Sequence, residues 1–298
     1  MGNGVNDELV SLVSGEWSAQ IHPQGAELRS LRDGAGREFM TDADPAFWTG
    51  YAPLLFPIVG GLRGDAFRHE GREYALPRHG FARRSRFAVV RQSEDAVTFA
   101  LEDSEATRAV YPFAFRLEMA FHLQGGSLRM TATVHNRGEV PMPFSFGYHP
   151  AFAWPLPGGG DKTAHRIIFA QEEPGPVRRV SKASGQLLPK GEATPVRARE
   201  LALHEGLFAN DAMVWTGLAS RALRYASPDG PALDIAFPDT PDLGLWQVPG
   251  AHYICIEPWA GHADPEGFAG EIGDKPGIIL LPSGKARAFR MDVSVSAG

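Results

Sequence analysis

The sequence predicts an all-β protein, a large antiparallel sandwich, and two observations carry this prediction. Apolar residues recur mostly at every second position, as in strands that bury one face. No Pro- and Gly-free stretch of about 12 residues shows a convincing 3.6-residue period, so long helices and the helical crossovers of doubly wound folds are not expected. Short strands between Gly- and Pro-containing turns are typical of a sandwich in which one sheet face can carry a site.

Four segments show the alternation most clearly. In each of them the apolar residues share one face, so each is expected to be a half-buried strand. They are Arg116–Leu123, Leu128–Val134, Leu233–Phe237 and Ala288–Val295.

Turns and loops separate these strands. Gln124–Gly126 and Ser227–Gly230 are turn signals, and the second joins two short alternating segments in the manner of a hairpin. Pro155–Lys162 and Glu172–Arg199 lack the alternation and are expected to be loops. Because the strand pattern resumes after both, we expect a single domain over residues 1–298, with a boundary near 160–200 as the alternative.

The charge balance and the cysteine count indicate which classes of partner and which cellular compartment to expect. The 298 residues include 29 Lys+Arg and 35 Asp+Glu, a net charge of −6, so neither nucleic acid nor an anionic membrane is an expected partner. Cys255 is the only cysteine, which excludes an intrachain disulfide. The chain start lacks the pattern of a secretory signal, and no run approaches the roughly 20 apolar residues that cross a bilayer. We expect a cytoplasmic monomer or homodimer that acts on a small molecule.

Several common chemistries leave a local motif that this sequence lacks. There is no G-x-S-x-G elbow, no phosphate-binding P-loop and no G-x-G-x-x-G, so no nucleotide cofactor is expected. His252, Glu257 and His262 are spaced by five residues, and residues five apart on a strand point to opposite faces. We therefore expect no metal at these residues.

Two histidines lie among aromatic and turn residues. His79 precedes Gly80 in the basic segment Leu76–Arg86, where a glycine permits a tight turn; a basic surface loop is the alternative. His149 lies within Phe144–Leu156, a segment rich in aromatic residues, where it is either a core histidine or an imidazole placed in a sugar-sized pocket.

A carboxylate completes the set. Glu257 is expected to end an apolar strand, followed at once by Pro258 and Trp259. Burial would raise its pKa toward a value useful for a base, and a carboxylate at the pocket rim is the alternative. Two imidazoles, a carboxylate, arginines and indole rings form a set suited to proton transfer on a polyol, whose apolar ring face packs on aromatic side chains.

Five motifs, in order along the chain, resemble the aldose 1-epimerases, also called galactose mutarotase-like proteins. The likeness runs from about Gly15 to the C-terminal strand, and two of the motifs, HGFAR and G-Y-H-P-A-F, are specific in combination. The motifs are Pro53–Arg63 (PLLFPIVGGLR), Pro77–Arg83 (PRHGFAR), Gly147–Leu156 (GYHPAFAWPL), Leu207–Val214 (LFANDAMV) and Ile256–Gly261 (IEPWAG).

The resemblance implies a β-supersandwich that interconverts the α and β anomers of an aldose without a cofactor. Glu257 looks like the base that takes the proton from the anomeric hydroxyl, and His149 like the acid that protonates the ring oxygen. The ring opens, the C1–C2 bond rotates, and reclosure gives the other anomer. His79 and Arg63 would hold hydroxyls and steady the charge that develops on the ring oxygen.

Three further assignments follow from the resemblance. Asp211 is similar to the hydroxyl-binding aspartate of the family, with Asp239 or Asp242 as alternatives. Trp259 is expected to stack on the sugar, and Phe81 either stacks or belongs to the core.

Two other functions remain open from the sequence. The related hexose-6-phosphate 1-epimerases hold the phosphate with arginines, a role open here to Arg63, Arg83, Arg84 and Arg86. A non-catalytic carbohydrate-binding or sensing module is the second alternative. The presence of both proton-transfer residues favours the enzyme over the binder.

Overall fold

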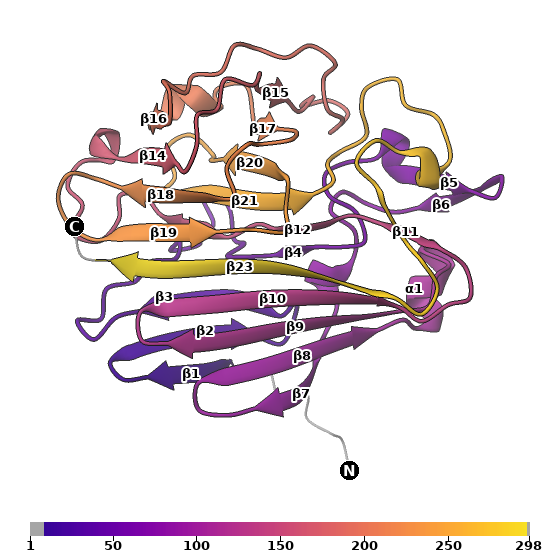
Figure 1. The fold of residues 1–298 in the computed structure, drawn as a ribbon, viewed down its shortest axis with the longest axis horizontal. Coiled ribbons are helices and arrows are strands. Elements are labelled where there is room, and N and C mark those ends of the chain that lie inside the picture. Colours follow the sequence, from indigo (N-terminus) through magenta and orange to yellow (C-terminus); the bar gives the residue numbers. More distant parts are fainter. Residues whose placement is uncertain (1–8, 297–298) are drawn as a thin grey trace.

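The computed structural model describes residues 9–296, and antiparallel β-sheets dominate it, which confirms the all-β prediction (Figure 1). The expectation about a signal at the chain start falls mainly on residues 1–8, outside this range. The strands are β1 (Val10–Ser14), β2 (Trp17–His22), β3 (Glu27–Arg32), β4 (Leu54–Leu55), β5 (Ala66–His69), β6 (Arg72–Ala75), β7 (Ala88–Gln92), β8 (Ala96–Glu102), β9 (Phe115–Gln124), β10 (Ser127–Asn136), β11 (Met142–Phe144), β12 (Phe146–Tyr148), β13 (Ala151–Ala153), β14 (Arg166–Phe169), β15 (Arg178–Arg179), β16 (Glu200–Ala202), β17 (Met213–Trp215), β18 (Ala222–Ala226), β19 (Ala232–Ala236), β20 (Asp242–Trp246), β21 (Tyr253–Ala260), β22 (Ile279–Leu281) and β23 (Ala286–Ser296).

Helices are few and short in the described part of the chain. The α-helix α1 spans Glu105–Val110, and a capping box between Ser104 and Thr107 closes its first turn. None of the helices in residues 9–296 is long and apolar enough to cross a membrane. The remaining helical turns are 3₁₀: Arg63–Asp65, Ala82–Arg84, Lys162–Ala164, Glu205–Phe208 and Ile272–Asp274.

The larger sheet has nine strands in the order β16-β14-β18-β19-β23-β10-β9-β8-β7. It contains all four strands predicted from the alternation, and its central strands β23, β10 and β9 lie side by side in Figure 1. Both predicted turns connect antiparallel neighbours, since Gln124–Gly126 joins β9 to β10 and Ser227–Gly230 lies between β18 and β19. The predicted loop Pro155–Lys162 contains no strand, and Glu172–Arg199 contains only the two-residue β15.

The second sheet has the order β15-β17-β20-β21-β12-β4, and β13 also pairs with β21. Its longest strand, β21, is buried along its whole length. The prediction that Glu257 ends this strand is wrong, because Pro258 and Trp259 continue it. Pro258 lies where β21 passes from its partner β13 to its partner β12, a place where a missing N–H disturbs the ladder least.

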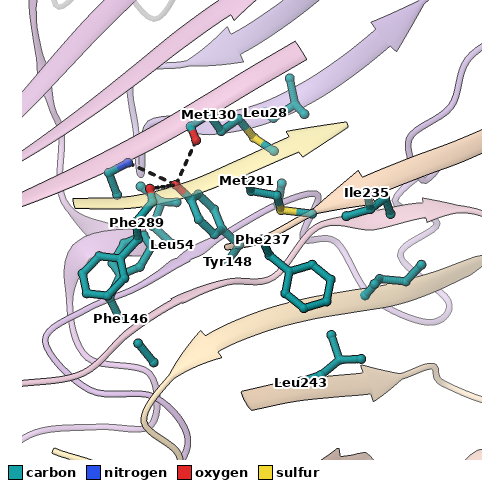
Figure 2. Packing of buried hydrophobic residues seen from close by; sticks show 14 of the residues in the cluster. Leu28, Leu54, Met130, Phe146, Tyr148, Ile235, Phe237, Leu243, Phe289 and Met291 are labelled. Atoms are coloured by element: carbon teal, nitrogen blue, oxygen red, sulfur yellow. Dashed lines mark hydrogen bonds between the residues drawn. The ribbon is translucent and has the colours of Figure 1, made fainter. Parts of the chain in front are cut away.

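The core lies between the sheets, and Tyr148 fastens one to the other (Figure 2). This residue ends β12 in the second sheet, and its hydroxyl donates to the carbonyl of Phe289 at 2.8 Å and accepts from the amide of Ala132 at 3.1 Å. Both partners lie in the nine-stranded sheet. Because His149 directly follows Tyr148, the two hydrogen bonds of the Tyr148 hydroxyl also fix the position of the His149 backbone.

Candidate active site

A cavity of about 310 Å³ opens on the second sheet, within the size range of small-molecule sites. Residues from β17, β20 and β21, from the turn after β12 and from several loops meet in it. The lining residues are Trp48, Gly60, Arg78, His79, Arg83, His149, Val180, Gly185, Leu187, Asp211, Ala212, Val214, Trp246, Glu257, Trp259, His262 and Ala263.

Glu257 supplies the carboxyl group of the cavity. It lies on β21 opposite Gly244 of β20, and only 2% of the residue is exposed. Burial raises the pKa of Glu257 well above its usual value, and the negative charge of Asp211 adds to the rise. The indole N–H of Trp259 opposes it, although Nε1 meets no acceptor with normal hydrogen-bond geometry within residues 9–296.

His149 faces this carboxyl group from the turn between β12 and β13. Its Nε2 lies 3.2 Å from Glu257 Oε2, and the ring of Trp48 covers it at a centroid distance of 5.2 Å. Burial lowers the pKa of His149 to about 3, and the nearby cation of Arg83 contributes. With the pKa of the carboxyl group raised and that of the imidazole lowered, burial disfavours the charged form of both Glu257 and His149.

His79 is held as a neutral hydrogen-bond donor. The backbone N–H of His79 donates to the carbonyl of Gly60 at 2.9 Å. The ring Nδ1 accepts a hydrogen bond from the Gly60 amide at 3.1 Å, so Nε2 carries the proton of the neutral ring. Burial and the charges around it keep the pKa of His79 well below 6.5. Both His79 and Gly80 have φ of 67°, and a side chain at Gly80 would lie 2.3 Å from the Phe56 carbonyl oxygen. The expected tight turn is therefore present.

Arg83 brings positive charge to the same wall. Its Nη2 donates to the Arg78 carbonyl at 3.2 Å, while its Nε is buried without a partner among the described residues. Burial and the charges of Arg84 and Arg78 lower the pKa of Arg83 to about 10, so it remains a cation at neutral pH. A buried N–H aimed at no protein acceptor is free to bind an oxygen of a ligand.

Among the three aspartates considered from the sequence, Asp211 is the one that lines the cavity. It has a φ of 70°, and its Oδ1 accepts the amide of Ala212 at 2.7 Å. Asp239 instead accepts the amide of Arg290 on β23. Asp242 accepts the Gly217 amide at 2.8 Å and contacts His262 Nδ1 at 3.1 Å, so it orients a residue of the cavity wall.

Arg63 and Phe81 lie outside the cavity. Arg63 lines a neighbouring hollow with Lys275, and its backbone N–H donates to Asp264 at 2.9 Å. Phe81 packs in the core against Phe56 and Phe115.

Some of the cavity wall escapes sequence reasoning. Trp48 and Trp246 carry no motif, although both rings pack against His149. Val180, Gly185 and Leu187 come from the segment expected to be only a loop. The lack of alternating apolar residues in Glu172–Arg199 indicates a loop, but no residue pattern in this segment indicates a binding surface.

Two glycines hold Trp259 in place. A Cβ at Gly147 would lie 2.5 Å from Trp259 Cδ1, and one at Gly244 would lie 2.5 Å from the far edge of the same ring. Neither glycine has a left-handed φ, so only the space for the indole requires glycine. Gly147 and Gly244 thus hold the Trp259 ring from its two opposite edges, next to Glu257 in β21.

We expect Gly244→Ala to lower the free energy of unfolding by about 1–3 kcal/mol, because the added methyl overpacks the site and pushes Trp259 aside. Urea unfolding measures the change. Gly175→Ala is the matched control, since a methyl group there meets no atom within 4 Å, and we expect it to shift stability by less than about 0.5 kcal/mol. Equal effects of the two substitutions would contradict the tight fit.

The chemistry available in the cavity is proton transfer. A carboxyl group and an imidazole lie in contact, with a neutral donor, a cation and three indole rings around them. The sequence pattern of the Aldose 1-epimerase family matches residues 8–271. The chain belongs to the aldose 1-epimerase family. This confirms the resemblance drawn from the five motifs.

Relatives of this family agree over nearly the full length. Protein LacX (chromosomal) of Lactococcus lactis subsp. lactis is 32% identical over 276 residues, which cover 89% of this chain and 92% of LacX. A galactose mutarotase related enzyme from Lactobacillus acidophilus superposes with a TM-score of 0.88 at 29% identity, covering 97% of each chain. A galactose 1-epimerase from Lactobacillus acidophilus NCFM shares the fold at a TM-score of 0.72, with 13% identity and coverage of 100% of this chain and 97% of the other.

Proposed function

We propose that the protein is an aldose 1-epimerase that interconverts the α and β anomers of a hexose, with Glu257 as base and His149 as acid. The observation that carries the proposal is the contact of 3.2 Å between Glu257 and His149 in a cavity of small-molecule size. Membership of the aldose 1-epimerase family supports it.

The reaction needs a Glu257 carboxylate and a protonated His149, which together carry one proton. Burial disfavours both of these charges. Transfer of a proton from the Glu257 carboxyl group to His149 across their 3.2 Å contact would produce this pair of charges without uptake from solvent. Polar sugar hydroxyls entering the cavity would favour this charge separation, since they replace part of the solvation that burial removes.

From that state, Glu257 would take the proton of the O1 hydroxyl as the C1–O5 bond breaks, and His149 would give its proton to O5. The open aldehyde rotates about C1–C2. Reclosure then runs the two transfers backwards on the other carbonyl face and restores both groups. No proton is gained or lost over the cycle, so no cofactor is required by the chemistry.

The remaining side chains would bind and orient the sugar. His79 would donate its Nε2 proton and Arg83 its free Nε–H to ring or hydroxyl oxygens, and both favour negative charge developing on O5. Asp211 would accept from hydroxyls. Trp259 would pack on the apolar face of the ring.

A phosphorylated hexose is the second candidate substrate. Arg78 and Arg83 both line the cavity, and a guanidinium pair suits a phosphate group. Arg63, which the sequence made a candidate for the same role, faces the neighbouring hollow instead. Of the four arginines proposed from the sequence, Arg83 is the one that lines the cavity, whereas Arg84 and Arg86 do not, and Arg78 joins Arg83 there.

The test is anomer exchange of α-D-galactose, α-D-glucose and glucose 6-phosphate, followed by polarimetry or NMR saturation transfer against the uncatalysed rate. We expect clear acceleration with at least one of them, and comparison of the free and phosphorylated sugars identifies the substrate class. Saturable binding without acceleration would overturn the enzyme proposal and favour a carbohydrate-binding or sensing module.

A further inference from the structure

Cys255 lies directly behind the proton-transfer pair. It precedes Glu257 by two residues on β21, so both side chains project from the same face of the strand. One ligand atom from each of His149, Cys255 and Glu257 lies within 4.8 Å of the other two, and all three residues are buried. An imidazole nitrogen, a thiol sulfur and a carboxylate oxygen thus lie close enough together to be considered as ligands of one ion.

The spacing is close to that of a zinc site. Tetrahedral Zn²⁺ with bonds of about 2.0–2.3 Å separates its ligand atoms by about 3.3–3.8 Å. His149 Nε2 and Glu257 Oε2 already lie 3.2 Å apart, so the remaining adjustment falls on the Cys255 side chain.

The pair also has unused polar atoms and an open side. Glu257 is 2% and His149 7% exposed, and Glu257 Oε2 and His149 Nδ1 make no hydrogen bond within residues 9–296. Both residues line the cavity, which leaves a fourth position for water. Three protein ligands and one open position form the arrangement of exchangeable and catalytic zinc sites, whereas structural sites use four protein ligands.

We propose that a thiophilic divalent cation, Zn²⁺ above all, binds at His149, Cys255 and Glu257 and thereby excludes the sugar from the cavity. The bound ion would occupy both proton-transfer groups, so it would act as an inhibitor. Only this inhibitory consequence rests on the proposed epimerase function. Thiolate and imidazole are poor ligands for Mg²⁺, which favours oxygen ligands and keeps its waters, so the site discriminates between the two ions.

The direct test uses Co²⁺ as a spectroscopic stand-in for Zn²⁺ with the full-length protein. We expect a thiolate-to-cobalt absorption band in the near ultraviolet that Zn²⁺ displaces and Mg²⁺ leaves unchanged. Cys255→Ser should lose the band. If serine at this buried position impairs folding, Cys255→Ala replaces it, with urea unfolding as the check on both.

The kinetic arm uses a substrate that the anomer assay identifies. Zn²⁺ should inhibit competitively and chelation should reverse the inhibition. Measured against its own basal rate, Cys255→Ser should need at least about tenfold more Zn²⁺ for half inhibition, because loss even of an outer partner of a metal ligand weakens binding 10- to 100-fold.

The outcomes separate the two proposals. A Cys255-dependent cobalt band without any epimerase activity would support the metal site and overturn the proposed function. A band that survives Cys255→Ser, no thiolate band at all, or zinc inhibition equal in the variant and the wild type would overturn the metal site and assign the ion to other residues.

Discussion

Glu257→Gln is expected to lower the rate of anomer exchange by about 10²- to 10⁴-fold, the usual contribution of a general base. The substitution keeps the shape of a side chain that is 2% exposed and removes only its ability to take up a proton. Sugar binding should persist, since the other lining residues are untouched. Anomer exchange by NMR gives the rate, and calorimetry or ligand-detected NMR gives the affinity.

Glu266→Gln is the matched control for this change. Glu266 lies nine residues further along the chain, and its side chain is exposed, so the same loss of charge there should leave the rate unchanged. If Glu257→Gln retains wild-type exchange, another group removes the proton and the assignment fails. If it loses both exchange and binding while remaining folded, Glu257 serves to hold the sugar.

Sequence reasoning predicts the frame of this fold because the frame depends on local pattern. In β9, β10 and β23 the alternation of apolar residues determines which face is buried. The turns between β9 and β10 and between β18 and β19 are indicated by their Gly, Pro and Asp residues. These signals need no knowledge of distant residues. The pairing of β10 with β23 cannot be predicted in this way, because these two strands are far apart in the sequence.

The site is predictable only where its residues carry a motif. His79, His149 and Glu257 stand out from their neighbours and meet in one cavity. Trp48 and Trp246 do not stand out, because an isolated tryptophan is equally at home in a core. Cys255 escapes for another reason: as the only cysteine it matches no metal-binding spacing, and its closeness to His149 arises from the pairing of β13 with β21.

The case of Arg63 shows the limit of a motif. Arg63 ends the motif Pro53–Arg63, yet its backbone N–H donates to Asp264 and the residue lines the neighbouring hollow, outside the cavity. A run of residues fixes the path of the backbone more firmly than the direction of a long side chain. Arg83, three residues past Gly80, supplies the cavity with a cation instead.

His149→Asn should lower the exchange rate by a similar factor of about 10² or more, because asparagine can still donate to the ring oxygen but cannot transfer a proton to it. His252→Asn is the matched control. His252 is exposed, with Asp42 as its nearest charged partner at 3.6 Å, so its loss should leave exchange unchanged. Equal rates for His149→Asn and wild type would assign the acid to another group.

The same variant tests whether His149 is buried in its neutral form. Its pKa is about 3 in the folded protein against an ordinary value of 6.5, so between these values the unfolded chain binds a proton that the folded chain refuses. Stability from this group is therefore complete above pH 6.5 and is lost as the pH falls toward 3. Between pH 7 and pH 5 the loss amounts to about 2 kcal/mol, at about 1.4 kcal/mol for each unit of pKa difference.

Between pH 7 and pH 5 the titration of Glu257 changes the stability in the opposite direction. The effect of His149 is therefore measured as the difference between wild type and His149→Asn. Its raised pKa means that the folded protein keeps a proton that the unfolded chain releases, so this group gains stability as the pH falls. That gain is common to wild type and His149→Asn. Urea unfolding at pH 7 and pH 5 should therefore show a loss larger by about 2 kcal/mol in the wild type, whereas an equal loss in both proteins would mean that His149 is solvated or already charged.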